Sequence, residues 1–359
     1  MKAAVCYEHG KPLVVEEVDI DPPKKGEVKV RMAATAVCHS DIHSIRGELP
    51  GRLPVIAGHE SSGYVDEIGE GVTSVKPGDP VVVSLVTACG KCYYCASGQS
   101  FLCNAQWPLD SEHRIHNKKG EGLFIGTRTG TFAEYCIVRE PQLVKLPDDM
   151  PMDAASLLAC GVITGFNSVV NRAQVRPFQS VAVIGVGGVG LNAVQGAAYS
   201  GAYPVIAVDM LDSKLKAAKK FGATHTVNAG NEKAVEEVKE LTEGRGADHV
   251  FITVGNVSAI EQAFTMLGRR GSAYIIGLPP FKDTITLPPL SFIRDEKELK
   301  GAYMGSTRLS VDIPNLITLY KRGILKLDEL ITDRYPLDQI NEAIESTESG
   351  EVLRNVIMF

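Results

Sequence analysis

The stretch of residues 180–201 reads SVAVIGVGGVGLNAVQGAAYSG and decides the fold of the second half of the chain. Val181–Ile184 is a short, β-branched apolar run that predicts a buried parallel strand. Residues 185–190 fit the pattern G-x-G-x-x-G, and residues 191–199 carry apolar side chains at helical spacing. A glycine turn between a strand and a helix is typical of a pyrophosphate site, because the backbone approaches closely and the helix N-terminus offers free N–H groups.

An acidic residue downstream supports this interpretation of the glycine turn. Residues 205–208 (VIAV) predict a second strand, and Asp209 follows it 19 residues after Gly190. A carboxylate at that distance is placed to accept a hydrogen bond from a ribose 2′-hydroxyl. The pattern alone would fit an ordinary glycine-rich turn. The order of strand, turn, helix, strand and acid favours a dinucleotide-binding unit.

Length and composition narrow the class of protein. The chain has 359 residues, which predicts two domains, and its formal net charge of −6 disfavours nucleic acid as the main partner. The sequence has no apolar run of membrane-spanning length, which disfavours a membrane partner. The N-terminal residues MKAAVCYEHGKP lack the apolar core of a signal peptide, so we expect a cytoplasmic protein.

The pattern of elements changes along the chain. The first part predicts strands separated by turn residues, over 2–6, 13–18, 27–33, 62–68, 80–84 and 133–138. The middle alternates predicted strands at 181–184, 205–208, 225–227, 249–253 and 272–276 with predicted helices at 191–200, 213–221, 232–242 and 259–267. We therefore expect an α/β and β protein: a barrel-like domain (1–161), an inserted doubly wound Rossmann domain of parallel strands (162–303), and a return to the first domain (304–359).

Four cysteines within 15 residues form one candidate metal site. Cys89, Cys92, Cys95 and Cys103 lie in a lobe of about residues 88–104. Four thiolates at this spacing close a tetrahedron around Zn²⁺ with no open position, which predicts a structural zinc site. A redox C-x-x-C would leave two cysteines over, and a DNA-binding zinc ribbon conflicts with the acidic charge.

A second set of potential ligands is scattered along the chain. Cys38, His59 and Cys160 could supply the Cys₂His set of a catalytic zinc, which needs three protein ligands and one open position. Each also has an ordinary alternative, since a buried cysteine can be a small core residue and a histidine can belong to a loop. Separation in sequence leaves both possibilities open.

Together these motifs resemble the zinc-dependent medium-chain alcohol dehydrogenases over nearly the whole chain. The motifs that carry the resemblance are Cys38-x-Ser40-Asp41-x-His43, Gly58-His59-Glu60, the four-cysteine lobe, Cys160-Gly161-x-x-Thr164-Gly165, and the glycine turn with Asp209. The resemblance implies a GroES-like catalytic domain with an inserted Rossmann domain, two zinc ions per subunit, and NAD as cofactor. Asp209 favours NAD over NADP, because a carboxylate repels a 2′-phosphate.

The resemblance also implies roles for individual residues. Cys38, His59 and Cys160 would bind the catalytic zinc, with Glu60 close behind the metal and Asp41 orienting His59. Ser40 would take the hydroxyl proton of the substrate and pass it through the cofactor ribose to His43, while a zinc-bound alkoxide transfers hydride to the nicotinamide C4. The cofactor would contact these residues: His39, Thr164, Gly185, Gly187, Gly188, Val189, Gly190, Asp209, Lys214, Ile276, Ala302, Met304 and Arg354.

Within this set, His39 and Arg354 would contact the pyrophosphate, and Asp209 and Lys214 would hold the adenosine ribose. The position of His39 is often arginine in relatives, and histidine is a weaker, pH-dependent phosphate partner. The expected reaction is the reversible oxidation of a small-molecule alcohol to an aldehyde or ketone. The expected assembly is a homodimer or homotetramer built by edge pairing near residues 287–303.

Two competing functions remain open at this point. One is a glutathione-dependent formaldehyde dehydrogenase of the same family, acting on S-hydroxymethylglutathione. It needs a cation for the glutathione carboxylates, and Arg114 is a weak candidate. The other is a non-catalytic binding protein on the same fold, which the complete set of ligand and cofactor residues disfavours. Residues 106–129, which hold Arg114 and the single tryptophan Trp107, fit either a substrate entrance, an interface or a solvated loop.

Overall fold

The chain folds into two compact units in the computed structural model, which describes residues 1–230 and 233–359. One unit comprises residues 1–160 together with 308–359, and the other comprises residues 161–307. The boundaries expected from the sequence lie after residues 161 and 303. Glu232, the first residue of one expected helix, lies outside the described residues.

Contacts at the end of the second unit explain why it extends to residue 307. Asn167 Nδ2 donates a hydrogen bond to Thr307 Oγ1 at 2.9 Å. A Cβ atom on Gly305 would lie 2.1 Å from the carbonyl oxygen of Ile163. Residues 304–307 therefore pack against the first helix of the same unit.

The first unit is built from a small closed barrel and a larger sheet. The barrel runs in the order β1-β2-β7-β8-β4, and the sheet runs β10-β6-β5-β3-β18-β17 with β9 also paired to β3. The strands are β1 (Lys2–Cys6), β2 (Val14–Ile20), β3 (Glu27–Ala36), β4 (Val55–Ile56), β5 (Glu60–Ile68), β6 (Pro80–Ser84), β7 (Ile115–Asn117), β8 (Gly122–Ile125), β9 (Tyr135–Arg139), β10 (Leu143–Lys145), β17 (Ile331–Pro336) and β18 (Arg354–Met358). The helices are α1 (His39–Ile45), α2 (Tyr93–Ala96), α3 (Met152–Ser156), α10 (Leu309–Lys321) and α11 (Ile340–Glu348).

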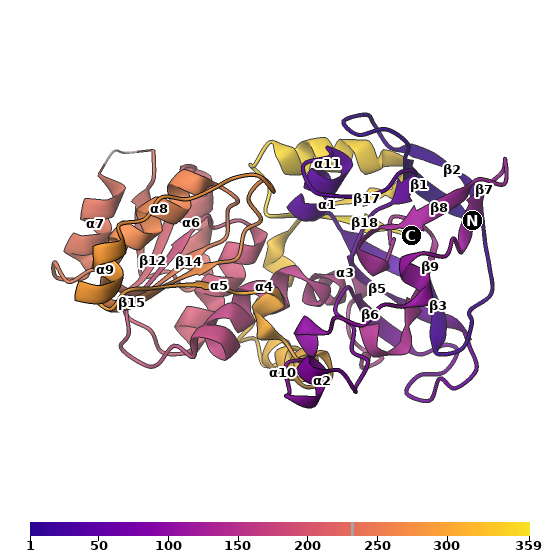
Figure 1. Ribbon diagram of the computed structural model, residues 1–359, viewed down its shortest axis with the longest axis horizontal. Coiled ribbons are helices and arrows are strands. Elements are labelled where there is room, and N and C mark those ends of the chain that lie inside the picture. The colour runs from indigo at the N-terminus through magenta and orange to yellow at the C-terminus, as the bar shows by residue number, and fades with distance from the viewer. Residues whose placement is uncertain (231–232) are drawn as a thin grey trace. The chain divides into compact units, whose positions relative to one another are not determined.

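Alternation along the strands fixes which face of the larger sheet is buried. In β3, Val28, Val30 and Met32 are almost fully buried and pack with Val65 and Cys136 from the neighbouring strands. Successive side chains of a strand point to opposite faces, so this period of two turns one face into a core. The C-terminal strand β18 pairs with β3, and α11 lies beside β17 and β18 (Figure 1).

The second unit is a doubly wound parallel sheet. Its strands are β11 (Val181–Ile184), β12 (Val205–Asp209), β13 (His225–Asn228), β14 (Ala247–Ile252), β15 (Leu267–Ile275) and β16 (Glu298–Gly301), in the order β13-β12-β11-β14-β15-β16 with all neighbours parallel. Its helices are α4 (Gly161–Asn167), α5 (Gly188–Tyr199), α6 (Asp212–Lys220), α7 (Ala234–Leu241), α8 (Val257–Met266) and α9 (Pro289–Arg294). A π-helical segment, η6 (Ser168–Ala173), continues α4.

Apolar strands of this sheet are buried by helices. Val181–Ile184 of β11 is buried throughout, as a central parallel strand should be. Helices α7 and α8 lie side by side and share one core with β11 and β14 (Figure 1). The chain order reverses between β11 and β14, which makes the edge where β11 ends the switch point at which such sheets bind ligands.

The expected fold class is confirmed, with local differences. Part of segment 106–129 forms the hairpin of β7 and β8, so it belongs to the closed barrel and is no solvated loop. The edge strand β16 escaped prediction because its sequence ELKG has no apolar run, and only pairing with β15 defines it. Among the described residues, no single helix is long and apolar enough to cross a membrane. The helical segments 152–159 and 161–173, which are bent relative to each other, reach the required length and apolar composition only when they are taken together.

Candidate active site

The first unit brings three separated ligand residues into one buried cluster. Cys38 follows β3 and caps α1, His59 precedes β5, and Cys160 is the last residue of the N-terminal part of this unit. Their side chains are 7%, 1% and 6% exposed, and the ligand atoms all lie within 4.8 Å of one another. Two thiols and an imidazole at this separation fit a zinc ion with a position left open. The alternative of unrelated core cysteines is therefore disfavoured.

Asp41 fixes the orientation of His59. Its carboxylate Oδ1 lies 2.8 Å from His59 Nδ1 and also accepts the backbone N–H of Gly58 at 3.0 Å. Because a carboxylate only accepts, the ring proton sits on Nδ1 and Nε2 is left for a metal. The hydroxyl of Ser40 lies 3.3 Å from His59 Nε2 and 3.2 Å from Cys38 Sγ, so it is next to the ligand atoms.

The backbone before His59 is shaped by the barrel. Gly58 has φ of +95°, and a Cβ there would lie 2.7 Å from the backbone nitrogen of Phe132. The Gly58 carbonyl accepts hydrogen bonds from the hydroxyl of Thr129 and the N–H of Thr131. These supporting threonines could not be found from the sequence, because nothing local links them to His59.

The pKa values of the three residues in the cluster shift in different directions. The hydrogen bond with Cys160 holds the pKa of the Cys38 thiol well below its ordinary value, helped by His59 and Arg354 against the opposing effect of burial. The same hydrogen bond, together with burial and the charge of Glu60, raises the pKa of Cys160. Burial lowers the pKa of His59, but Asp41 and Cys38 outweigh it, so that pKa lies well above its ordinary value. A cation that binds here must displace protons, so its affinity depends on pH.

A buried ion pair stands beside the cluster. Glu60, the first residue of β5, is fully buried, and its Oε2 lies 3.5 Å from Nη1 of Arg354, the first residue of β18. Burial lowers the pKa of Arg354, but the charges of Glu60, Cys38 and Cys160 raise it by more than burial lowers it. The net pKa lies above its ordinary value, so the guanidinium stays charged. Arg354 Nη2 is buried without a hydrogen-bond partner among the described residues, so it retains a donor for an anionic group.

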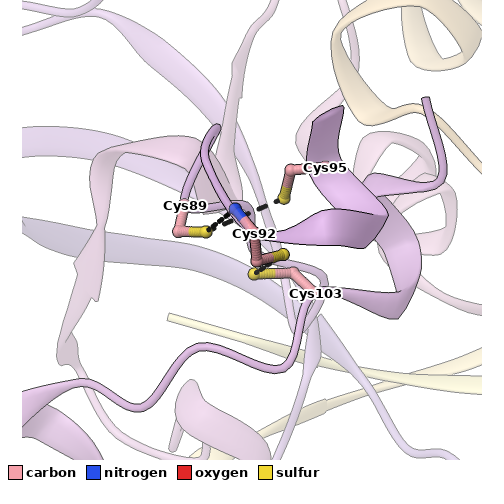
Figure 2. A group of neighbouring side chains, drawn as sticks. All are labelled: Cys89, Cys92, Cys95 and Cys103. Atoms are coloured by element: carbon pink, nitrogen blue, oxygen red, sulfur yellow. Dashed lines mark hydrogen bonds between the residues drawn. The ribbon is translucent and has the colours of Figure 1, made fainter. Parts of the chain in front are cut away.

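The four-cysteine lobe is a second preformed cluster (Figure 2). Its sulfur atoms also lie within 4.8 Å of one another, with 4.0 Å between Cys89 and Cys95 and 3.9 Å between Cys92 and Cys103. A tetrahedron with Zn–S bonds of about 2.3 Å separates its sulfurs by roughly 3.8 Å. The Cys89 sulfur also accepts the N–H of Cys92 at 3.2 Å. The four residues therefore fit a closed structural zinc site.

The glycine turn has the shape that a pyrophosphate site requires. Gly185 has φ of +85°, and a Cβ on Gly190 would lie 1.9 Å from the Gly185 carbonyl oxygen. At the neighbouring strand end, Asp209 accepts the N–H groups of Val186 at 2.8 Å and Leu211 at 3.0 Å. Lys214 Nζ comes within 3.9 Å of where a Gly187 Cβ would stand, so a cation lies over the turn.

The remaining expected cofactor residues of the second unit lie near the ends of its strands. Ile276 and Ala302 follow β15 and β16 directly, at the carboxyl edge of the sheet. The hydroxyl of Thr164 donates to the sulfur of Met304 at 3.6 Å. In the first unit, His39 is the exposed first residue of α1.

Arg114 is committed to the core of its own unit. It is 1% exposed; its Nη1 lies 2.9 Å from Glu27, and its Nη2 donates to the carbonyl of Pro22 at 2.6 Å. Arg114 is the weak candidate that the sequence offers as an anchor for the carboxylates of glutathione. A buried guanidinium that is already paired cannot serve that purpose without breaking the core.

Comparisons with known proteins agree with these two units. The alcohol dehydrogenase GroES-like domain family matches residues 24–148, and the zinc-binding dehydrogenase family matches residues 188–322. An NDMA-dependent alcohol dehydrogenase of Amycolatopsis methanolica is 41% identical over 99% of this chain and 98% of its own length. An S-(hydroxymethyl)glutathione dehydrogenase of Saccharomyces cerevisiae is 37% identical over 99% of this chain and 95% of its own length.

A solved structure gives the same result in three dimensions. The crystal structure of benzyl alcohol dehydrogenase from Acinetobacter calcoaceticus superimposes with a TM-score of 0.93 at 31% identity, covering 100% of this chain and 99% of that one. The match in fold and sequence extends along both units. The chain belongs to the zinc-dependent medium-chain dehydrogenase/reductase family of alcohol dehydrogenases, which are oxidoreductases.

Proposed function

We propose that the protein oxidises an alcohol reversibly to an aldehyde or ketone, with NAD as hydride acceptor and one catalytic and one structural zinc ion per subunit. The observation that carries the proposal is the buried cluster of Cys38, His59 and Cys160 with the hydroxyl of Ser40 beside it. When bound, zinc supplies Lewis acidity toward the alcohol oxygen, and the nicotinamide supplies the hydride acceptor.

The side chains around the cluster would handle the proton. Ser40 is within hydrogen-bond reach of the ligand atoms, so it is placed to accept the hydroxyl proton of an alcohol held there. Ser40 and His43 are three residues apart on α1 and so share a face of the helix. The side chain of His43 is 33% exposed, which lets it release the proton to solvent.

A carboxylate at the end of β12 supports NAD as the cofactor. Two backbone N–H groups fix the carboxylate of Asp209 at the end of β12, where we propose that it accepts a hydrogen bond from the ribose 2′-hydroxyl. Met210 and Leu211 follow it and offer no cation that would neutralise a 2′-phosphate.

A cysteine pair tests the zinc mechanism. Cys38→Ser should abolish NADH formation while the protein still binds NADH, measured by fluorescence titration. Cys136→Ser is the matched control, because Cys136 is a buried strand thiol outside both clusters. Full activity of Cys38→Ser would contradict the proposal.

The identity of the electron acceptor is tested separately, because the relative from Amycolatopsis methanolica is named NDMA-dependent. Purified protein should be assayed with each alcohol in the presence of NAD alone and of NDMA alone. Turnover with NAD alone supports the proposal. Turnover that requires NDMA would assign free NAD a different role.

A glutathione adduct is the second candidate substrate, since one relative is named S-(hydroxymethyl)glutathione dehydrogenase. The burial of Arg114 removes the cation considered for that substrate. We therefore expect simple alcohols, benzyl alcohol included, to be turned over with a higher kcat/KM than S-hydroxymethylglutathione. The reverse order would favour the second candidate.

We also propose a homodimer or homotetramer built at the edge strand β16. In the described sheet, β16 pairs with β15 on one side only. Leu290 and Ile293 on the neighbouring helix α9 are 63% and 80% exposed. An open strand edge beside exposed apolar side chains favours pairing with a second copy.

A further inference from the structure

The C-terminal turn of α1 brings a carboxylate against His43. The helix ends at Ile45, and Gly47 adopts φ of +77°. The N–H of Gly47 donates to the carbonyl of Ser44 at 3.1 Å, and the N–H of Glu48 donates to the carbonyl of His43 at 2.9 Å. These two bonds define a Schellman motif, which sets the residue after the glycine beside the residue one turn back in the helix.

The side-chain contact of this motif is polar in this chain. An apolar pair frequently accompanies a Schellman motif. Here the carboxylate of Glu48 makes a short hydrogen bond with Nδ1 of His43. Because a carboxylate only accepts, the ring proton lies on Nδ1, and Nε2 of the neutral ring carries the free lone pair.

Neighbouring segments hold the turn in place. The carbonyl of Ile45 accepts the N–H of Gly10 at 3.0 Å, and His9 Nδ1 lies 3.3 Å from the same oxygen. Arg46 pairs at 2.5 Å with Glu348 of α11, which lies beside α1 (Figure 1). The titratable and charged groups of this turn and of the segments packed on it are thus Glu48, His9, Arg46 and Glu348, and the carboxylate in contact with the ring of His43 is that of Glu48.

The same arrangement occurs at the other end of α1. Asp41 holds Nδ1 of His59 and so directs Nε2 of that ring toward the ligand thiols. One short helix therefore contributes one member, Asp41 or His43, to each of two pairs of a carboxylate with an imidazole. The first pair orients a metal ligand, and the second involves the histidine at which the proton path from Ser40 ends.

We propose that Glu48 is a positioning residue for proton transfer, holding Nδ1–H of His43 so that Nε2 accepts the proton that leaves the substrate hydroxyl by way of Ser40. The proposal rests on the proposed function. The O–H bond of the substrate breaks, an N–H bond forms at Nε2, and the resulting imidazolium stays paired with Glu48 until Nε2 returns the proton to water. No further reactant is needed.

The informative variant is Glu48→Leu. Leucine restores the apolar contact usual for a Schellman motif, so the helix end should persist while the acceptor on Nδ1 is lost. Nitrogen-15 NMR of the histidine rings, without cofactor or substrate, reports the tautomer of His43, whose signals are identified by their loss in His43→Gln. We expect Nδ1–H in the wild type and a shift toward Nε2–H in Glu48→Leu.

Kinetics supply the second measurement. In Glu48→Leu, kcat for alcohol oxidation should fall about tenfold near neutral pH, part of the roughly 10²–10⁴-fold that general base catalysis supplies. The loss should shrink as hydroxide replaces the base at higher pH, with KM for the alcohol and the Kd of NADH unchanged. Glu48→Asp should recover part of the loss. Glu348→Leu is the matched control. It removes the ion-pair partner of Arg46, which lies in the same turn as Glu48, and it should change neither the tautomer of His43 nor kcat.

The two readouts separate this proposal from the proposed function. If Glu48→Leu keeps the Nδ1–H tautomer, or keeps the wild-type pH profile, Glu48 only caps the helix and the proposal is overturned. If the wild type oxidises no alcohol, the proposed function fails, and the NMR result alone decides whether Glu48 sets the tautomer of His43.

Discussion

Single carboxylates decide several properties of this protein through the groups they hold. Asp41 orients a candidate metal ligand, Glu60 pairs with a guanidinium next to the thiols, and Asp209 lies in the proposed ribose site. Each is fixed by backbone or side-chain donors, so the charge has a defined position. Substitutions at these positions should therefore change specificity or proton transfer before they change the fold.

Cofactor preference should depend on the charge of Asp209. Asp209→Asn keeps one acceptor oxygen for the N–H groups of Val186 and Leu211, and it removes the charge that repels a 2′-phosphate. We expect the ratio of kcat/KM for NAD to that for NADP to fall at least about tenfold, as for losing an interaction with a charged group. Asp212→Asn, three residues further along, should leave the ratio unchanged. An unchanged ratio in Asp209→Asn would remove Asp209 from the specificity argument.

The buried pair of Arg114 and Glu27 should matter for stability. Arg114→Met leaves Glu27 charged and without its main partner in the core, which costs about 3–5 kcal/mol for buried pairs. Adding Glu27→Gln should restore a large part of the loss in urea unfolding. Lys118→Met, which breaks the exposed pair with Asp19, is the control and should alter stability little. A stable Arg114→Met protein that still carries Glu27 would contradict this account.

At the scale of elements, close backbone approaches define the cofactor turn. Gly190→Ala places a methyl group 1.9 Å from the Gly185 carbonyl, so the strand and helix must separate. We expect a loss of roughly 1–3 kcal/mol in denaturant unfolding, as for overpacked sites, and weaker NADH binding. At Gly187 the nearest atom to a new Cβ is Lys214 Nζ at 3.9 Å, so Gly187→Ala should unfold like the wild type. Equal stability of the two variants would argue against the packing role of Gly190.

The four-cysteine lobe should bind zinc in a pH-dependent way. The backbone hydrogen bond from Cys95 lowers the pKa of Cys92 to about 6, and burial raises the pKa of Cys95 to about 11. Zinc needs thiolates, so its affinity should fall as the pH drops through about 6 and Cys92 takes up a proton. Zinc binding near neutral pH should release the proton of Cys95.

Chelator competition from about pH 5 to pH 8 measures this dependence. The Cys38→Ser background limits the measurement to the four-cysteine lobe. A zinc affinity that stays constant over this range would show that these thiols do not titrate as described.

For the whole molecule, the edge of the parallel sheet should control assembly. Ile293, on the helix that precedes the edge strand β16 in the chain, is 80% exposed, whereas Phe178 is 87% exposed elsewhere on the same unit. Ile293→Asp should shift the mass measured by light scattering toward that of the monomer, because a charge in the interface must be desolvated. Phe178→Asp should leave the mass at that of the wild type. The opposite pattern would place the interface away from β16.

Local patterns already predict much of the molecule. Val181–Ile184 and the glycines after it predict the first strand, turn and helix of the parallel sheet, because that motif depends on contacts close in sequence. The four-cysteine lobe is predictable for the same reason. The ends of elements and the short edge strand β16 were missed or shifted, since pairing with a neighbour defines them and composition does not.

What the sequence by itself determined is the class of chemistry: a dinucleotide turn, a closed four-thiolate site, and a set of residues able to bind a second metal. Only the tertiary structure decided that Cys38, His59 and Cys160 meet, that Arg114 is buried against Glu27, and that Glu48 lies on the ring of His43. The physical reason is range. The glycine turn and the four-cysteine lobe depend on residues close together in the sequence. Buried ligand clusters and ion pairs instead depend on which distant strands pack together in the core.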